Sequence, residues 1–292
     1  MLNFPIIKQN SVRIVSLAVS HNRREKTIKA LEDLYAQDLP EYVRLEHVLV
    51  DDASVDGTAK TVSLRFPEIT ILKGSGQLFW AGGMRFGWSR IKERSFDYLF
   101  VYNDDVRLHT NALNVLVECA QRYTPGIVVG SFSDHTGSVT TYGGQVRENR
   151  WHPLRFKRIA PEDCPIEVDT LNMNGALISS SLLKEQGFLS EYFVHSGADF
   201  EYGMKIRKAG WVILTAPGYI GTCERNVSAP ACSHDASVRG MFRQRHADKR
   251  TPMNVHFHFC FAYCGPFWPF FFLSPYVKII ISGLHRRLKV FL

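Results

Sequence analysis

The sequence predicts an α/β fold in which helices cover both faces of a mostly parallel central sheet. In the first hundred residues, short runs of apolar and β-branched residues alternate with segments whose apolar residues recur at helical spacing. These strand candidates are mostly continuous apolar runs, which is typical of strands buried on both faces of a parallel sheet. Polar residues follow three of them directly, at the strand ends where open parallel sheets bind ligands.

Each expected element follows from its local residue pattern. We expect strands at 12–19, 45–50, 69–72 and 98–102, and helices at 21–37, from 56 to just before Pro67, and after a glycine-rich stretch to about 93. Ser20 or Asn22 is the expected N-cap of the first helix. Beyond residue 125 we expect strands at 126–130 and 211–215, an apolar segment at 174–179, a hairpin or long loop at 131–165, and helices at 182–186 and 200–208.

The basic excess of the chain lies at its C-terminal end. The formal net charge is +7, and residues 235–292 alone contain nine Lys or Arg against two Asp or Glu, which is also +7. The remaining body is neutral, which argues against nucleic-acid binding, because that function needs a basic working face. The composition changes between residues 234 and 252, so we expect a main domain at 1–240 and a C-terminal segment at 241–292.

Six cysteines without a C-x-x-C pair, and an N-terminus without a signal-peptide pattern, favour reduced thiols and a cytoplasmic location.

Acidic residues gather at the carboxyl ends of two expected strands. Asp51, Asp52 and Asp56 follow the second strand, and because one acid suffices to cap the next helix, three indicate a ligand as well. A carboxylate there can accept a hydrogen bond from a ribose hydroxyl or a base N–H. After the fourth strand, Asp104 and Asp105 repel each other unless a cation lies between them, and oxygen ligands are those that Mg²⁺ and Mn²⁺ prefer. A solvated turn is the alternative.

Three further features are open to two interpretations each. The glycine-rich stretch at 74–85 lets the backbone approach a ligand, but its spacing is neither a Rossmann fingerprint nor a P-loop, and Trp80 within it equally fits a hydrophobic core. Asp199 either takes part in chemistry or caps the helix that follows it, and Glu201 either assists or faces solvent. His234 alone is weak evidence for a metal ligand.

Together these motifs resemble a known family. DDASVDGT at 51–58, YNDDV at 102–106 and ADFEYGMKIRKAGW at 198–211 resemble family 2 glycosyltransferases of the GT-A fold, whose sheet is Rossmann-like. The stretch GQLFWAGGMR at 76–85 is similar to that of rhamnosyltransferase-like bacterial members. The resemblance extends over about residues 12–240.

The resemblance implies a role for each candidate residue. Asp52 would hold the nucleotide base with Asp51 and Ser20 nearby, and Asp104 would contact the ribose. Asp105 and His234 would bind the metal, and Asp199 would be the catalytic base. Gly82, Gly83 and Arg85 would belong to the donor-binding stretch. One departure is Ala198, because the family often has Glu before the base; Glu201 is the candidate replacement.

The implied function is inverting, Mn²⁺- or Mg²⁺-dependent transfer of a hexose or deoxyhexose. The donor would be a UDP- or dTDP-linked sugar, and the acceptor a glycan or lipid-linked glycan in polysaccharide biosynthesis. A sugar nucleotidyltransferase is disfavoured because residues 21–24 lack the glycines that such a loop needs. A non-catalytic sugar-nucleotide-binding partner subunit is the remaining alternative.

The C-terminal segment predicts a surface for anionic lipid. Residues 265–284 are long and apolar enough to suggest a membrane span, but three prolines and Lys278 disfavour one. From Tyr276 onward apolar residues fall on one helical face and basic residues on the other. This pattern predicts a basic amphipathic helix that lies in the inner face of the cell membrane. A helix that docks on the core or on a second copy is the alternative.

Overall fold

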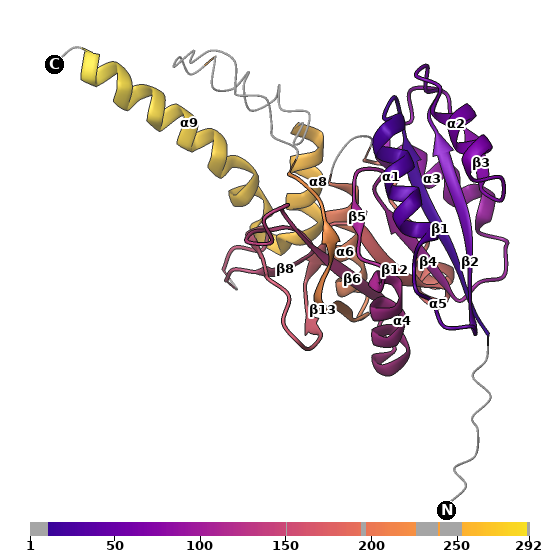
Figure 1. The fold of residues 1–292 in the computed structure, drawn as a ribbon. Helices are drawn as coiled ribbons and strands as arrows, with labels where there is room; N and C mark the ends of the chain where they lie inside the picture. Colours follow the sequence, from indigo (N-terminus) through magenta and orange to yellow (C-terminus); the bar gives the residue numbers. More distant parts are fainter. Residues whose placement is uncertain (1–10, 150, 194–196, 226–238, 240–252, 291–292) are drawn as a thin grey trace, which may run out of the picture.

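The structure is a computed structural model that describes residues 11–149, 151–193, 197–225, 239 and 253–290, with side chains up to residue 282. A ten-stranded sheet forms the centre of the molecule (Figure 1), with the strand order β10-β13-β6-β12-β4-β1-β2-β3 and with β5 and β7 paired to β13 and β6. A second sheet has three strands in the order β11-β8-β9. The expected α/β class is confirmed.

The N-terminal half alternates strands and helices as expected. Its elements are β1 (Val12–Ser20), α1 (Arg24–Tyr35), β2 (Val43–Asp51), α2 (Thr58–Arg65), β3 (Thr70–Lys73), α3 (Phe79–Ile91) and β4 (Tyr98–Tyr102). β1 runs parallel to both β2 and β4, and β2 runs parallel to β3. In this register Ser20 lies opposite Asp51, so the polar residues after β1, β2 and β4 meet at one edge of the sheet.

The C-terminal half mixes strand directions. Its elements are β5 (Arg107–Leu108), α4 (Ala112–Tyr123), β6 (Ile127–Ser133), β7 (Thr140–Tyr142), β8 (Gly144–Arg147), β9 (Phe156–Arg158), β10 (Ile166–Glu167), β11 (Thr170–Leu171), β12 (Gly175–Ser179), α5 (Ser180–Gln186), α6 (Ala198–Lys208) and β13 (Ile213–Thr222). β12 lies antiparallel between β4 and β6, whereas β13 is parallel to β6. Within the stretch at 131–165, where a hairpin or long loop was expected, β8 and β9 pair antiparallel as a hairpin.

The expected caps of α1 were wrong. Arg23 occupies the N-cap position without a side-chain hydrogen bond. Asp56, which lies in the next loop, accepts a hydrogen bond from the N–H of Arg24 at 2.9 Å. Asn22 instead accepts the N–H of Val55 at 2.8 Å, and the hydroxyl of Ser20 bonds that of Thr27 at 2.7 Å. The helix therefore begins later than expected because a side chain from a distant loop satisfies its first N–H group.

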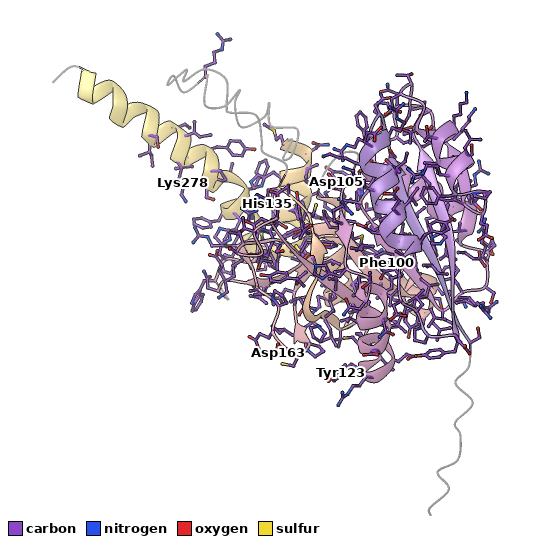
Figure 2. All side chains as sticks on the ribbon, in the orientation of Figure 1. Phe100, Asp105, Tyr123, His135, Asp163 and Lys278 are labelled. Carbon is purple, nitrogen blue, oxygen red and sulfur yellow. The ribbon has the colours of Figure 1, made fainter. Side chains whose placement is uncertain are left out.

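The hydrophobic core consists of two clusters, one on each face of the central sheet. Alternate residues of the buried strands divide between them: Phe100 of β4 packs with α1 and α4, and Val101 packs with α3 and α6. Figure 2 shows side chains filling this body around Phe100. The sheet edge that carries the polar residues is therefore held from both sides by buried packing.

Two adjacent glycines of α3 predict opposite effects on stability. A Cβ atom added at Gly83 would lie 2.6 Å from Cγ1 of Val19, whereas one at Gly82 would lie 3.6 Å from its nearest neighbour, Cβ of Leu78. We expect Gly83→Ala to lower the free energy of unfolding by about 1–3 kcal/mol, because Val19 is stiff and buried. We expect Gly82→Ala to raise it by about 0.5–1 kcal/mol, because alanine favours the helix. Urea unfolding of the two variants tests this, and equal changes in both would contradict it.

The C-terminal segment forms α8 (Met253–Tyr263), a short 3-10 turn at Gly265–Phe267 and α9 (Trp268–Val290). α8 packs on the body through the buried residues Val255 and Cys260. α9 stands away from the body in Figure 1, and Figure 2 shows Lys278 on this projecting part. The helix was expected to begin at Tyr276, but it begins eight residues earlier and contains Pro275. In the described part of the chain, no helix is long and apolar enough to cross a membrane.

Candidate active site

A cavity of about 890 Å³ lies at the carboxyl ends of β1, β2 and β4. It extends from this edge to the start of α6 and to the small sheet that contains β9. The polar and aromatic residues that line it include His21, Arg23, Asp52, Trp80, Asn103, Asp104, Asp105, Tyr142, Arg158, Asn172, Asn174, Asp199 and Arg225. The parallel arrangement gathers the acids that follow β2 and β4 around one space, as expected for the sheet edge, and Asp199 reaches the same space from α6.

Asp52 holds the loop that leads into α3. Its carboxylate accepts hydrogen bonds from the N–H groups of Gly76 at 2.7 Å, Leu78 at 2.9 Å and Phe79 at 3.3 Å. A Cβ atom at Gly74 would lie 2.5 Å from the same carboxylate, so only glycine fits beside it. Asp52 thus holds the backbone of the glycine-rich stretch in place, and together they form one wall of the cavity.

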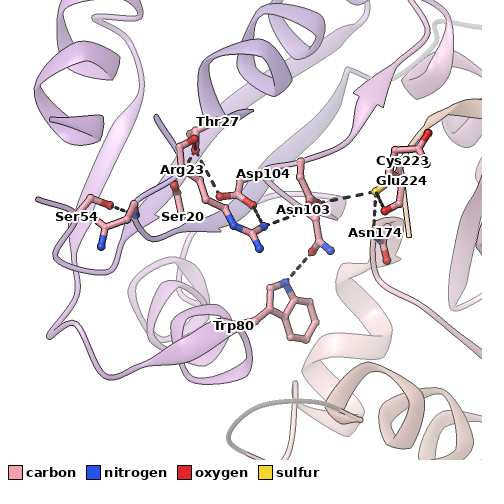
Figure 3. Close-up of polar contacts among 12 residues, drawn as sticks. Ser20, Arg23, Thr27, Ser54, Trp80, Asn103, Asp104, Asn174, Cys223 and Glu224 are labelled. Atoms are coloured by element: carbon pink, nitrogen blue, oxygen red, sulfur yellow. Dashed lines mark hydrogen bonds and ion pairs between the residues drawn. The ribbon is translucent and has the colours of Figure 1, made fainter. Parts of the chain in front are cut away.

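Arg23 joins the two acids that follow β4. Its Nη1 atom lies 3.0 Å from Oδ1 of Asp104 and 3.1 Å from Oδ2 of Asp105, as Figure 3 shows for Asp104. Burial raises the pKa of Asp104 above its ordinary value, although Arg23 opposes this. Burial alone would lower the pKa of Arg23, but the charges of Asp104 and Asp105 raise it. The two carboxylates therefore converge on one point, which a cationic group occupies.

This convergence fits a hard divalent cation. Mg²⁺ and Mn²⁺ often take one or two carboxylates and complete their shell with water and substrate phosphates. Cys223 lies beside Asp105 and donates to Oδ1 over 3.9 Å. Among the described residues no three His, Cys, Asp or Glu side chains cluster to form a fuller metal site. His234, the expected further ligand, lies outside the described residues.

Asp199 lies at the start of α6 and lines the same cavity as Asp52. Gly197, with φ of 86°, turns the chain into the helix. The Asp199 carboxylate accepts hydrogen bonds from Nδ2 of Asn172 at 3.3 Å, from the N–H of Met173 at 3.4 Å and from the N–H of Phe200 at 2.8 Å. Burial raises the pKa of Asp199 above its ordinary value, and these hydrogen bonds lower it in part. A carboxylate with a raised pKa is suited to accept a proton from a hydroxyl group.

Glu201 does not assist Asp199. Its side chain is buried, and Oε1 accepts a hydrogen bond from the hydroxyl of Tyr263 on α8 at 2.6 Å. It does not line the cavity, and it does not face solvent. Successive residues of a helix point in different directions, so a carboxylate two positions after Asp199 cannot share its site.

Several predicted residues lie near the cavity without lining it. Ser20 and Asp51 are buried behind the sheet edge, and Oδ1 of Asp51 has no hydrogen-bond partner among the described residues. Gly82 and Gly83 lie within α3, which packs against β1. Arg85 donates to the carbonyl oxygens of Ser190 and Phe193, at 2.8 Å each, and so holds the loop before α6. By contrast, Trp80 lines the cavity and donates to Asn103 at 2.8 Å (Figure 3).

Three arginines of the cavity were not among the predicted site residues. Arg23 follows the first strand by three positions, so its place at the polar sheet edge was a usable signal. Arg158 ends the short strand β9, and Arg225 follows β13. Nothing in their local sequence indicates that they face a shared cavity, because the two segments meet only through the tertiary fold.

Comparisons with known proteins show the family of the chain. The model of the family described as Glycosyl transferase family 2 matches residues 17–184. An N-acetylglucosaminyl-diphospho-decaprenol L-rhamnosyltransferase of Mycobacterium tuberculosis is 22% identical over 196 residues. That match covers 58% of this chain and 63% of the length of the mycobacterial protein.

Two solved structures share the fold at low sequence identity. A mannosyltransferase from Pyrobaculum calidifontis in complex with GDP-Man and Mn²⁺ has a TM-score of 0.56 and 17% identity, covering 95% of this chain and 74% of that one. Residues 1–349 of S. aureus TarS have a TM-score of 0.60 and 14% identity, covering 93% and 89%. TarS has also been solved in complex with UDP-GlcNAc and with UDP.

Proposed function

The chain belongs to glycosyl transferase family 2 and has a GT-A fold, and from this premise we propose that it transfers a sugar from a nucleotide-diphosphate donor to a hydroxyl group of a glycan or lipid-linked glycan. The observation that carries the proposal is that Asp52, Asp104 and Asp105 line the same cavity as Asp199. Nucleotide-binding groups and a proton acceptor are thus present on the same space, as sugar transfer requires.

The donor nucleotide belongs at the sheet edge. In this proposal Asp104 accepts hydrogen bonds from the ribose, and the wall built by Asp52 receives the base, with Ser20 and Asp51 behind it. Gly83 and Arg85 act from outside the cavity, Gly83 by close packing of α3 on Val19 and Arg85 by holding the loop before α6, and Gly82 lies beside Gly83 in α3. The sugar nucleotides in the similar structures are GDP-Man and UDP-GlcNAc, and we propose a UDP- or dTDP-linked hexose or deoxyhexose for this chain.

Asp105, with Asp104 beside it, would hold Mg²⁺ or Mn²⁺, and His234 is the proposed further ligand. A bound cation stabilises the negative charge that grows on the leaving diphosphate without any proton transfer. The Pyrobaculum mannosyltransferase binds Mn²⁺ together with its donor. Arg23, which lies between the two carboxylates, adds a second positive charge at the same end of the cavity.

Asp199 is the proposed catalytic base. It accepts the proton of the acceptor hydroxyl as the oxygen of that hydroxyl attacks the anomeric carbon and the bond to the diphosphate breaks. One carboxylate suffices for this direct displacement, which inverts the anomeric carbon, because no covalent sugar–enzyme intermediate forms. The raised pKa of Asp199 favours proton uptake, and Asn172 keeps the carboxylate oriented toward the cavity.

A panel of sugar nucleotides tests the proposal. We expect the full chain, with Mn²⁺ or Mg²⁺, to bind at least one UDP-, dTDP- or GDP-linked sugar and to release the nucleoside diphosphate slowly in water. Binding without turnover, even with candidate acceptors added, would favour the non-catalytic partner subunit. Formation of a sugar nucleotide from a sugar 1-phosphate and a nucleoside triphosphate would favour the nucleotidyltransferase. Binding of no sugar nucleotide would reject the proposal.

We also propose that the C-terminal helices bring the enzyme to the inner face of the cell membrane. Phe261 of α8, Phe267 and Phe270 expose 62%, 69% and 68% of their surface, and Ile281 of α9 exposes 59%. Lys278 lies among them, which is the combination of apolar and basic groups that anionic lipid surfaces attract. The name of the mycobacterial relative includes a decaprenol-linked substrate.

Loss of two of these phenylalanines predicts weaker membrane binding. We expect the Phe267→Ser and Phe270→Ser double variant to partition at least about tenfold less onto vesicles containing anionic lipid, because each buried apolar side chain contributes about 1.5–3 kcal/mol. Val55→Ser with Leu64→Ser is the matched control, since those side chains are 90% and 74% exposed on the body. Vesicle sedimentation measures the change, and equal partitioning of both double variants would reject this role.

A further inference from the structure

Two arginines that face the cavity have no acidic partner there. Arg158 and Arg225 both line the cavity, and neither forms an ion pair with another described residue. The Arg158 guanidinium lies 5.7 Å from the centre of the Tyr142 ring and donates to Oδ1 of Asn172 over 3.4 Å. Its buried Nε–H has no hydrogen-bond partner within the described part of the chain.

This arrangement is unfavourable without a ligand. Burial lowers the pKa of Arg158, and the nearby positive charge of Arg225 lowers it further. Two like charges and an unsatisfied buried donor all raise the free energy of the protein alone. An anion with several oxygen atoms would neutralise both charges and accept the free hydrogen bond, and guanidinium groups match phosphate oxygens in geometry.

The position of Arg158 relative to Asp199 indicates which substrate supplies that anion. Asn172 bonds both residues: its Oδ1 accepts from Arg158, and its Nδ2 donates to Asp199 at 3.3 Å. Arg158 is therefore one side chain away from the proposed base. The donor diphosphate belongs beside Asp104 and Asp105, where Arg23 already supplies a positive charge. In an in-line displacement the base and the leaving diphosphate lie on opposite sides of the transferred sugar, so groups around the base contact the acceptor.

We propose that Arg158 and Arg225 bind a phosphate or diphosphate group of the acceptor, next to the sugar whose hydroxyl reacts. This inference rests on the proposed function, and it narrows the acceptor to an anionic glycosyl phosphate rather than a neutral glycan. Asn172 then links binding of the acceptor phosphate to the orientation of the base, because its amide group bonds both Arg158 and Asp199. An acceptor without the phosphate would lose this alignment as well as the ionic contact.

Decyl diphosphate is a suitable probe, because it carries the anion and an alkyl chain but no sugar. Its binding to the full chain is measured by calorimetry with Mg²⁺ and saturating UDP or dTDP, whichever binds more tightly, so that the donor site is filled. We expect Arg158→Gln and Arg225→Gln each to weaken decyl diphosphate binding by about tenfold or more, as loss of a charge-assisted hydrogen bond does. Nucleotide binding, measured separately, should change by less than about twofold. Decyl glucoside, which is neutral, should bind no more weakly to the variants than to the wild type.

Arg155→Gln is the matched control, since Arg155 precedes the same short strand, has the same charge and pairs with Glu148 outside the cavity. It should leave both affinities unchanged. If Arg158→Gln fails to fold, Arg158→Lys and Arg225→Gln carry the test, because Arg225 is exposed. Unchanged decyl diphosphate binding in the variants, no binding by the wild type, or loss of nucleotide affinity instead would overturn the inference. Failure of the wild type to bind any nucleoside diphosphate would reject the proposed function itself.

Discussion

Asp199→Asn is expected to lower kcat for sugar transfer by about 10²–10⁴-fold, the usual contribution of a general base. Asparagine keeps the size of the side chain, but its single oxygen can accept from Asn172 or from the N–H of Phe200 and not from both, and it cannot take the proton of the acceptor hydroxyl. KM for the donor should change little, because the nucleotide end of the cavity is untouched. Release of nucleoside diphosphate in the presence of acceptor measures the effect.

The pH dependence of the wild-type enzyme gives a second readout of the same residue. Burial raises the pKa of Asp199, and only the deprotonated carboxylate accepts a proton. Activity should therefore fall as the pH decreases through a pKa above the ordinary value of 3.8 for Asp. The residual activity of Asp199→Asn should lack this acidic limb. Asp163→Asn, at an exposed position, is the matched control; an unchanged kcat in Asp199→Asn would exclude the assignment.

Asp105→Asn is expected to weaken Mn²⁺ binding and metal-dependent nucleotide binding by about 10²-fold or more, because a cation loses one of two charged oxygen ligands. Titration of Mn²⁺ followed by electron paramagnetic resonance measures metal binding directly, without any need for turnover. Transfer activity should fall by a similar factor. The Asp163→Asn variant again controls for the change of charge.

Two results would argue against Asp105 as a metal ligand. Metal affinity equal to that of the wild type would remove it from the site. Activity that is equally high with and without divalent cation, in both proteins, would show that Arg23 alone neutralises the diphosphate. Loss of metal-dependent nucleotide binding with an unchanged unfolding curve would support the assignment.

Sequence patterns predicted the N-terminal half of the fold, in which strands and helices alternate along the chain and the paired strands run parallel. The strands at 12–20, 43–51 and 98–102 are rich in apolar and β-branched residues, and each ends in or is followed by polar residues that the parallel register brings to one edge. The candidate acids Asp52, Asp104 and Asp105 line the cavity for that reason, whereas Asp199 reaches it from the first turn of α6. Their assigned roles remain predictions.

The remaining features depend on contacts that a local pattern does not contain. The direction of β12 is set by its neighbours β4 and β6, since an apolar five-residue strand can pair either way. Helix α4 was missed, although Leu113, Leu116, Val117 and Ala120 recur at helical spacing and are buried. Arg158 reaches the cavity only because a small separate sheet folds over it.

Two hydrogen bonds join α6, the helix that contains Asp199, to α8 of the C-terminal segment. The hydroxyl of Tyr263 bonds Glu201 at 2.6 Å, and Nζ of Lys208 donates to the carbonyl oxygen of Ala262 at 3.2 Å. Glu201, which accepts the first bond, and Lys208, which donates the second, both belong to α6, and Asp199 lies in the first turn of that helix. A displacement of α8 is therefore transmitted to the helix that contains Asp199. If the tail binds a membrane surface, as proposed, its orientation on that surface sets the direction in which the cavity opens.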